Sequence, residues 1–391
     1  MKKRVLLSFL DSIFPKRNII IFNSFPDVTD NSFALYRYIV TNREDISHKY
    51  KLVWTVSCNP RIMEEKLNAL IKGYNHVVVS KKSFKGLLLF LRAKYLITTH
   101  GYFGGIGNVN GQTHINLWHG MPLKTIGKGM RQQSSTGFGI DADITVATSE
   151  LFQELIAYSF QINKTQVKIT GLPRNDMLFD KGFGLANLNI SANFNKVIMW
   201  MPTYRKSVVG DIRNDGNSDG FGLKDVLFND FERLDDLLKR KNYLLLIKPH
   251  PMDELSKMEL PSSEHIVCVN DEILNKYNVP LYFLLADTDA LITDYSSVFI
   301  DYLLTGNPIA FACNDLKEYE NTRGFYFENI QEKMPGQFLE NKSQFFDYLE
   351  RMDEFNSVWM DKYFEVRNGF NPLVDGKACE RFCNTIWGET I

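Results

Sequence analysis

Two histidines stand in sequence contexts that suit chemistry at neutral pH. His119 lies in the stretch "NLWHG", behind an apolar run and directly before Gly120. An imidazole can accept a proton near pH 7, and a following glycine lets a substrate approach the backbone. The pattern therefore suits a general base at His119. Taken alone, however, this stretch favours a structural histidine bonded to a carbonyl group.

The second histidine lies in the stretch "IKPHP". Pro249 and Pro251 stiffen the chain around His250 and place Lys248 on the same side of an extended segment. This arrangement suits a charged group such as a phosphate, whereas a solvated strand end is the alternative for the lysine. Guanidinium groups also match phosphate geometry, although each could be an ordinary surface residue. The arginines considered are Arg174, Arg205 and Arg323.

A pair of serines follows an apolar run in "LITDYSSVFIDYLLTG", residues 291–306. Ser296 and Ser297 are expected to open a helix that runs to Thr305. Free backbone N–H groups and the positive end of the helix dipole make such a start suitable for an anion. Taken alone, the stretch favours a serine that simply caps the helix, since serine is a preferred N-cap residue.

The elements that must position these residues are predicted by short apolar runs with helical stretches between them. Such runs, apolar without strict alternation, are typical of parallel strands covered on both faces. The fold class is therefore α/β and doubly wound. The predicted strand regions are 18–24, 50–57, 76–80, 94–100, 114–120, 144–150, 167–173, 196–205, 242–251, 265–271, 290–297 and 308–313.

Polar residues gather at the carboxyl ends of five of these predicted strands, drawn from both halves of the chain. In open α/β sheets, ligands bind outside the carboxyl ends of the strands. We therefore expect the five segments to meet in one cleft between two domains. The segments are 118–120, 171–174, 202–205, 248–251 and 293–297.

Composition narrows the class of protein. The chain has 391 residues, 44% of them hydrophobic and 23% charged, as in a globular protein of two domains. A net charge of −1 gives no basic field for nucleic acid. Five scattered cysteines do not form a disulfide framework. Asp-x-Asp spacing at 141–143 and 287–289 resembles metal-ligand spacing, but helix capping or strand contact is the favoured interpretation.

Two segments combine basic residues with an apolar run. Residues 1–17 place one apolar stripe among lysines and arginines, and residues 80–96 repeat the combination. This is the pattern of a helix on an anionic membrane surface, and packing against the chain's own domain is the alternative. Asp11 and Pro15 interrupt the first segment, and it has no small-residue cleavage site, so no export is expected.

Motifs for other chemistries fit poorly. The stretch 104–111 misses the dinucleotide fingerprint because Asn110 occupies the third glycine position. The sequence has no Walker phosphate loop and no Gly-x-Ser-x-Gly elbow. Residues 180–196 are rich in Gly and Asn with weak periodicity, and are expected to link the two domains.

Seven motifs follow one another along the chain: "NLWHGMPLKTIG", "ATSELFQE", "ITGLPRNDML", "MPTYR", "IKPHP", "ITDYSSVFIDYLLTGNPIAF" and "RGFYFE". Taken in order, they resemble the motifs of the CDP-glycerol glycerophosphotransferase family of teichoic-acid and capsule polymerases. The resemblance runs from about Ser24 to Gly376. It implies two Rossmann-like domains in the glycosyltransferase type B arrangement, with the active site in the interdomain cleft.

The resemblance also implies a reaction and a division of the chain. A polyol phosphate, first of all glycerol phosphate, would pass from a CDP-polyol to a hydroxyl of a lipid-linked acceptor, with release of CMP. Residues 1–185 would form an acceptor- and membrane-facing domain, 186–375 a CDP-donor-binding domain, and 376–391 a closing helix. The protein would act as a peripheral protein at the cytoplasmic face of the membrane, in teichoic acid or capsule synthesis, without a metal or other cofactor and without nucleic acid.

Residue roles follow by the same resemblance. His119 would deprotonate the acceptor hydroxyl, and His250 would help to stabilise the leaving CMP. Asp301 would meet polyol or ribose hydroxyls. The remaining donor-binding residues would be Gly120, Met121, Pro122, Leu123, Arg174, Pro202, Thr203, Arg205, Lys248, Ser296, Ser297 and Arg323.

Several alternatives stay open. The donor could be CDP-ribitol, and Met121 and Tyr204 stand where the family pattern leads us to expect Thr and Phe, which loosens any inference about the polyol. A sugar-nucleotide glycosyltransferase of the same fold would release a nucleoside diphosphate instead of CMP. A non-catalytic membrane-associated subunit is least favoured, because a binding module would not need His119 and His250 together.

Overall fold

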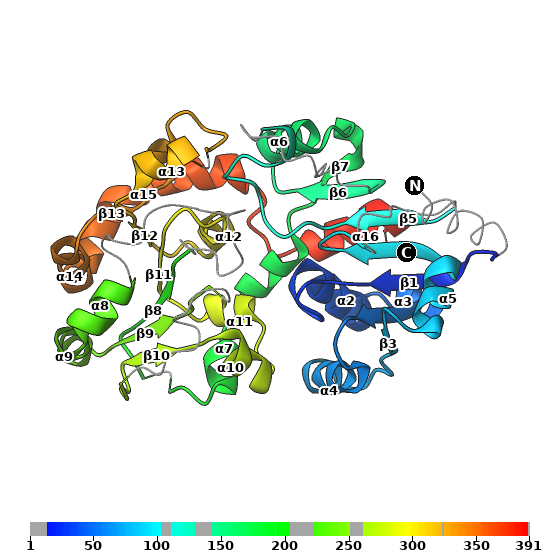
Figure 1. Ribbon diagram of the computed structural model, residues 1–391, viewed down its shortest axis with the longest axis horizontal. Coiled ribbons are helices and arrows are strands. Elements are labelled where there is room, and N and C mark those ends of the chain that lie inside the picture. Colours follow the sequence, from blue (N-terminus) through cyan, green and yellow to red (C-terminus); the bar gives the residue numbers. More distant parts are fainter. Residues whose placement is uncertain are drawn as a thin grey trace. The chain divides into compact units, whose positions relative to one another are not determined.

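The structure is a computed structural model that describes residues 14–102, 111–129, 142–191, 193–203, 223–250, 261–322 and 324–389. The chain divides into two compact units, which are described separately. Unit 1 comprises residues 1–121, 135–177 and 373–391, and unit 2 comprises 122–134 and 178–372. Figure 1 shows the elements of both units.

Unit 1 is built on a seven-stranded sheet in the order β3-β2-β1-β4-β5-β6-β7, and every pairing is parallel. The order reverses between β1 and β4, which makes their carboxyl ends the switch point of the sheet. The strands are β1 (Arg17–Phe22), β2 (Lys51–Val56), β3 (Val78–Ser80), β4 (Ala93–Thr98), β5 (Thr113–Asn116), β6 (Ile144–Ala147) and β7 (Val167–Ile169).

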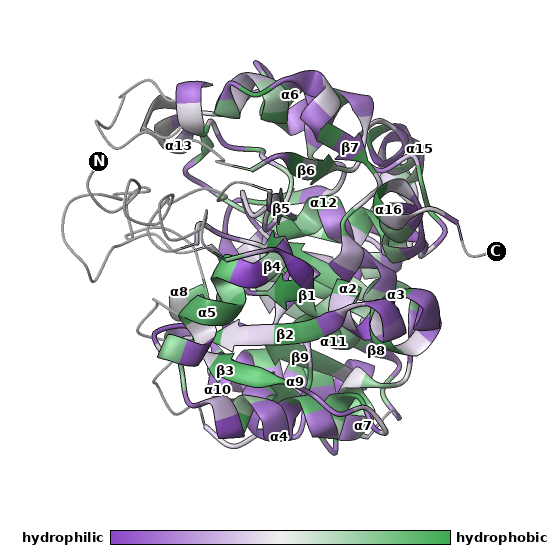
Figure 2. Ribbon diagram, turned by 90° about the vertical axis from the view of Figure 1, so that its right-hand side faces the viewer, coloured by the Kyte–Doolittle hydropathy of each residue, from purple (hydrophilic) through white to green (hydrophobic). Residues whose placement is uncertain are grey.

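The helices of unit 1 begin where the sequence supplies caps. Asn59, Ser83 and Ser149 each accept a backbone N–H through the side chain at the start of a helix. In Figure 2, β3 and β6 are mainly in the hydrophobic colour and the helices carry both colours, as expected for strands covered on both faces. The helices are α2 (Asp30–Asn42), α3 (Glu44–Lys49), α4 (Pro60–Leu70), α5 (Phe84–Arg92), α6 (Glu150–Phe160) and α16 (Ala378–Trp387), with 3-10 turns η2 (Lys164–Gln166) and η3 (Pro173–Phe179).

Helix α16, at the end of the chain, belongs to unit 1 and packs against α2. Asp176 accepts hydrogen bonds from the backbone N–H groups of Ala378 and Cys379, at 2.8 Å each, and so caps the helix from a distant segment. Arg43 donates to the Asn384 side chain and to the Gly388 carbonyl at its other end. Both ends of the last helix are therefore fixed to the first unit.

Unit 2 contains a six-stranded parallel sheet in the order β10-β9-β8-β11-β12-β13, with its switch point between β8 and β11. The strands are β8 (Lys196–Met201), β9 (Tyr243–Ile247), β10 (Ile266–Cys268), β11 (Ala290–Thr293), β12 (Ile309–Ala312) and β13 (Gln337–Leu339). The helices are α7 (Gly184–Asn187), α8 (Leu223–Asn229), α9 (Phe231–Lys241), α10 (Asp271–Lys276), α11 (Leu281–Ala286), α12 (Val298–Tyr302), α13 (Leu316–Thr322), α14 (Lys342–Glu350) and α15 (Met352–Phe370), with 3-10 turns η1 (Gly127–Gly129), η5 (Leu303–Thr305) and η6 (Ile330–Lys333).

The predicted α/β class is confirmed, and each predicted strand region contains a strand. The short strand β13 was not predicted. Residues 180–196 are not a simple linker, because α7 packs against α11 and a Cβ on Gly184 would lie 2.4 Å from the Leu284 Cα. The units also differ from the predicted ranges 1–185, 186–375 and 376–391: the chain passes into unit 2 after Met177, segment 122–134 belongs to unit 2, and 373–391 returns to unit 1.

Candidate active site

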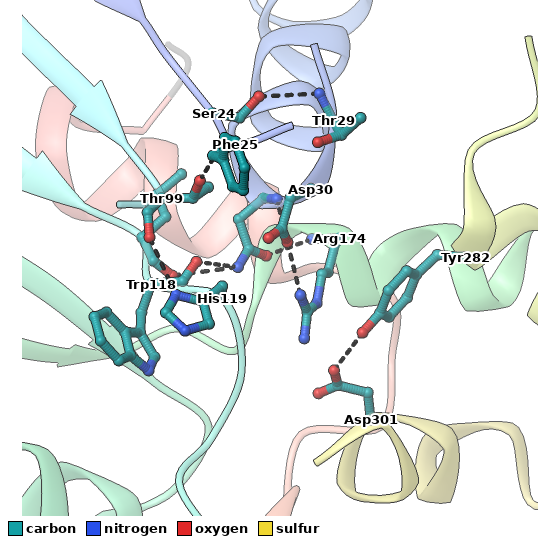
Figure 3. A network of polar contacts seen from close by, with 12 residues as sticks. Ser24, Phe25, Thr29, Asp30, Thr99, Trp118, His119, Arg174, Tyr282 and Asp301 are labelled. Carbon is teal, nitrogen blue, oxygen red and sulfur yellow. Dashed lines mark hydrogen bonds and ion pairs between the residues drawn. The ribbon is translucent and has the colours of Figure 1, made fainter. Parts of the chain in front are cut away.

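In unit 1, polar side chains gather just beyond the strands at the switch point. Asn23 and Ser24 follow β1, Thr99 and His100 follow β4, and His119 lies three residues beyond β5. Parallel strands end at the same edge, so this edge concentrates the side chains able to do chemistry. Figure 3 shows His119 and Trp118 near Thr99, Asp30 and Arg174.

His119 sits in a turn with unusual backbone geometry. Trp118 has φ +55° and Gly120 has φ +141°, both in the region that favours glycine. The imidazole stacks on His100, with ring centroids 4.4 Å apart and an angle of 7° between the rings, and its Nδ1 lies 3.4 Å from the Thr99 carbonyl oxygen. A tryptophan in a left-handed conformation needs support from its surroundings, and that support comes from helix α2.

Asn31, in the first turn of α2, is fully buried and holds this turn. Its Nδ2 donates to the carbonyl oxygens of Leu117, at 3.2 Å, and Trp118, at 2.9 Å. Its Oδ1 accepts the backbone N–H of Arg174 at 3.0 Å. One amide thus joins the His119 turn to η3, which carries Arg174.

Arg174 is paired inside unit 1. Its Nη1 donates to Asp30 Oδ1 at 2.7 Å, and the two side chains are 8% and 14% exposed (Figure 3). The same carboxylate oxygen accepts the backbone N–H of Asn31 at 2.8 Å. Asp30 itself has φ +60°. A buried pair of this kind is held more firmly where further hydrogen bonds satisfy its atoms, and the Asn31 N–H provides one such bond to Asp30.

The surroundings make His119 a neutral imidazole. Although His119 keeps exposed surface, desolvation by the surrounding protein, followed by the adjacent His100, lowers its pKa to about 4. Asp30 raises that pKa and Arg174 lowers it. Desolvation also lowers the pKa of His100. At neutral pH both rings are therefore unprotonated, and His119 is in the form that can accept a proton.

In unit 2, Thr203 and Asp294 meet at the switch point between β8 and β11. Asp294 Oδ2 accepts the Thr203 backbone N–H at 2.9 Å and the Thr203 hydroxyl at 2.8 Å. The Thr293 hydroxyl donates to the Met201 carbonyl at 2.6 Å. The predicted residues Pro202 and Thr203 are thereby fixed to the strand end that carries the serines.

Lys248 and His250 follow β9, the neighbour of β8. The Lys248 side chain is 7% exposed, and its Nζ lies 2.7 Å from Oδ1 of Asp271, whose side chain is 40% exposed. His250 is half-buried. The sheet order therefore places the lysine, the histidine and the Thr203 segment on adjacent strand ends of one unit.

The serine segment is shorter in its helical part than predicted. Helix α12 begins at Val298 and passes into the 3-10 turn η5 at Leu303. Ser297 occupies the N-cap position without a side-chain capping bond, and the Ser296 hydroxyl accepts the Val298 N–H at 3.4 Å. The serines are half-buried, and their anion-binding role stays a prediction.

Asp301 lies in a different setting from the one expected. It is fully buried, and its Oδ2 accepts the hydroxyl of Tyr282 at 2.5 Å. This burial weighs against a contact between Asp301 and a substrate hydroxyl, which stays a prediction.

The "WHGMPL" motif is divided between the two units. Gly120 and Met121 belong to unit 1, whereas Pro122 and Leu123 belong to unit 2. Within unit 2, the Leu123 carbonyl accepts the Tyr326 N–H at 3.1 Å, which ties the motif to the "RGFYFE" segment. Arg205, Arg323 and residues 1–13 lie outside the described residues.

Sequence reasoning missed Asp30, Asn31 and His100. A signal for His100 was present, because "ITTH" ends a predicted strand as "LWHG" does. The first strand likewise ends in "NS", just before the loop that leads to Asp30. The rule about strand ends, applied to every strand, would have drawn attention to both segments.

The described part of the chain contains no group of three or more His, Cys, Asp or Glu side chains that could hold a metal ion. Asp287 caps α7 and Asp289 accepts the Val197 N–H at 2.7 Å, as the capping interpretation predicted. No helix among these residues has the length and apolar character needed to cross a membrane.

Comparison with known families identifies the chain. The family described as CDP-Glycerol:Poly(glycerophosphate) glycerophosphotransferase matches residues 6–388. The chain belongs to this family. The resemblance seen in the motifs is confirmed, and the protein is a transferase of the teichoic acid polyol-phosphate transferase and polymerase group.

Curated relatives include proteins named for glycerol and for ribitol. The teichoic acid glycerol-phosphate transferase of Staphylococcus aureus is 28% identical over 407 residues, which cover 96% of this chain and 94% of the relative. The teichoic acid poly(glycerol phosphate) polymerase of Bacillus subtilis is 24% identical, and the match covers 95% of this chain but 49% of the polymerase. The S. aureus ribitol-phosphate polymerase TarL is 28% identical, over 71% of this chain and 48% of its own length.

Solved structures with the same fold include the wall teichoic acid polymerase TagF, at a TM-score of 0.75 and 23% identity, covering 98% of this chain and 92% of that one. A UDP-N-acetylglucosamine 2-epimerase matches at a TM-score of 0.50 and 11% identity, over 95% and 96% of the two chains. At these identities the likeness shows the fold alone, which has two parallel-sheet domains.

Proposed function

We propose that the protein transfers a polyol phosphate, first of all glycerol phosphate, from a CDP-polyol to a hydroxyl of a lipid-linked acceptor and releases CMP. The observation that carries this proposal is His119. Its ring is held at the switch point of unit 1 and is neutral because desolvation and His100 lower its pKa to about 4. The family match supplies the donor class, and the imidazole supplies the base that transfer to a hydroxyl requires.

The proposed step is a displacement at phosphorus. The acceptor oxygen attacks the phosphorus that bears the polyol, and the bond between this phosphorus and the oxygen bridging it to CMP breaks. The electron pair leaves with CMP, and the hydroxyl proton passes to Nε2 of His119. This nitrogen carries the lone pair when Nδ1 donates toward the Thr99 carbonyl, 3.4 Å away. A diphosphate beside the ring adds negative charge, which raises the pKa of the imidazole as the reaction needs.

Unit 2 is proposed to hold the diphosphate. Lys248 and His250 follow β9, Thr203 follows β8, and Ser296 and Ser297 follow β11, so their strand ends are neighbours. These donors suit a leaving group on which negative charge grows. The proposed arrangement is that of a glycosyltransferase of type B, with the reaction in the cleft between the domains. No metal is required in this proposal, so a chelator should leave turnover unchanged.

Glycerol is preferred over ribitol because the relatives matched over most of this chain include several that are named for glycerol phosphate. Ribitol is the second candidate, because the poly(ribitol-phosphate) polymerase of Bacillus spizizenii matches 95% of the chain at 27% identity, and the ribitol-phosphate polymerases TarL and TarK match 71% of it at 28% and 29% identity. The reaction that releases CMP is common to both.

The first experiment measures CMP release from CDP-glycerol and, separately, from CDP-ribitol, with a short lipid-linked glycerol-phosphate acceptor. Wild type should release CMP only with acceptor present, and His119→Gln should lose at least 1,000-fold in kcat, roughly the contribution of a positioned base. His48→Gln is the matched control, because His48 is exposed on α3. Absence of CMP from both donors would reject the proposal, and release of a nucleoside diphosphate from a sugar nucleotide would favour the glycosyltransferase alternative.

Contact with the cytoplasmic face of an anionic membrane is the second part of the proposal. Of the segment 80–96, Phe90 and Leu91 pack into the core of unit 1, but Phe84 is 81% exposed and stands beside Lys85. An exposed aromatic ring among lysines suits an anionic lipid surface. Wild type should co-sediment with vesicles containing phosphatidylglycerol, and Phe84→Ser should weaken this binding more than Ile62→Ser on α4. Equal binding to neutral vesicles would contradict the electrostatic part.

A further inference from the structure

The start of helix α2 is joined to the candidate base by contacts that the proposed reaction does not itself use. Asn31 is fully buried, and its two amide protons go to the carbonyl oxygens of Leu117 and Trp118, the two residues before His119. Trp118 is held at φ +55°, where a side chain larger than hydrogen is strained. The direction of the imidazole therefore depends on a turn that Asn31 stabilises.

Asp30, the residue before Asn31, changes the electrostatic surroundings of the same ring. Asp30 accepts a hydrogen bond from Arg174 at 2.7 Å, and both side chains are largely buried. The groups that act on the His119 imidazole come from three elements: Asp30 from α2, His100 from the end of β4, and Arg174 from η3. Without Asp30, the positive charge of Arg174 would act on the ring with no compensation.

We propose that Asp30 and Asn31 are positioning residues for His119: Asn31 fixes the turn that carries the imidazole, and Asp30 neutralises Arg174 beside it. The inference rests on the proposed function, since it treats His119 as the base. Neither residue is expected to touch the substrate, and each acts through the ring that does. The chemistry requires such support, because a displacement of about 1 Å at the reacting groups can cost 100-fold in rate.

The charges around the His119 ring predict the direction in which Asp30→Asn shifts the pKa of His119. Asp30 raises the pKa of His119, and Arg174 lowers it. Asp30→Asn removes the raising charge and leaves the lowering one, so the pKa of His119 should fall below its value of about 4 in the wild type. The acid limb of the pH profile of kcat/KM should shift to lower pH accordingly, because a more acidic solution would then be needed to protonate the base. A purely structural role for Asp30 would not move this limb in that direction.

The experiment follows the His119 ring directly in the full-length protein. The histidine ring signals are titrated by NMR without substrate, and the His119 signal is assigned by its absence in His119→Gln. Asn31→Ser is expected to change the chemical shift of the His119 signal and to lower kcat by 10- to 100-fold, with the donor KM changed by less than threefold. Asp30→Asn is expected to lower the pKa read from the signal.

The matched control is Asn371→Ser in unit 2. Asn371 is also buried and also donates to a carbonyl oxygen, that of Ile300 at 2.6 Å. It should lower the melting temperature while leaving the His119 signal as in the wild type. Should Asn31→Ser fail to fold, Asp30→Asn and the milder Asn31→Gln decide the question by the same signal.

The outcomes separate this inference from the proposed function. If the His119 signal and its titration are the same in Asn31→Ser, Asp30→Asn and wild type, the positioning role is overturned whatever the enzyme does. If the wild type releases no CMP from either donor, the proposed function fails, but the NMR titration still decides whether Asp30 and Asn31 control the ring.

Discussion

Arg174 in unit 1 and Lys248 in unit 2 are both buried cations that lie 2.7 Å from a carboxylate, yet their partners differ. Asp30, the partner of Arg174, is 14% exposed and also accepts the Asn31 N–H. Asp271, the partner of Lys248, is 40% exposed. A half-exposed carboxylate can turn toward water at little cost, whereas a buried one cannot.

The difference indicates different tasks for the two cations. The ion pair that holds Arg174 breaks only at a high cost in free energy, so we expect Arg174 to stabilise the structure around His119. Lys248 can exchange its carboxylate for another anion, so it is the better candidate to bind a phosphate. The expectation from the sequence that both cations bind the donor is therefore better supported for Lys248 than for Arg174.

The largest effect that this comparison predicts is on stability. Arg174→Met should lower the free energy of unfolding by about 3–5 kcal/mol, because it leaves the Asp30 carboxylate buried without a partner. Denaturant unfolding of the full chain measures this loss. The double variant Arg174→Met/Asp30→Asn should recover most of the loss, because it removes the uncompensated charge and asparagine tolerates the backbone of residue 30, whose φ is +60°. A stable Arg174→Met that has lost donor binding would reverse the assignment.

A smaller effect is expected at Lys248. Lys248→Met should weaken the binding of CDP-glycerol by 10- to 100-fold, since hydrogen bonds to charged groups contribute about 1.5–3 kcal/mol. Binding is measured by isothermal titration calorimetry. Both proteins carry His119→Gln in addition, which prevents turnover during the measurement. The matched control is Lys196→Met, because Lys196 lies at the opposite end of β8 and pairs with Asp353 at 2.8 Å. Equal weakening by both variants would show that the effect is not specific to the strand end.

The sequence allowed more of the fold to be predicted than of the contacts within the site. Runs of buried β-branched and leucine residues marked the strands because each run is local, and the rule of strand ends pointed to His119, Thr203 and Lys248. Strand β13 was not predicted because its apolar residues are only Phe338 and Leu339, which stand between Gln337 and Glu340 and form no longer apolar run.

The contacts around His119 could not be predicted in the same way. Asp30 and Arg174 are 144 positions apart, and Asn31 and Trp118 are 87 apart. No local pattern specifies such pairs, since they form only when strands β1, β5 and β7 take their places in one sheet. The burial of Asp301 against Tyr282 was not predicted for the same reason. Helical spacing shows on which face of the helix a residue lies, but not which residues pack against that face.

The path of the chain through the two units has a consequence for how the protein is made. Unit 1 begins with the first residues, yet it is completed by α16, whose N–H groups at Ala378 and Cys379 are capped by Asp176, two positions beyond Arg174. These last residues leave the ribosome after all of unit 2 has been synthesised. The segment beside the candidate base therefore gains its anchor only after unit 2 has been synthesised, and until then a nascent chain can have a complete second sheet but not a complete first unit.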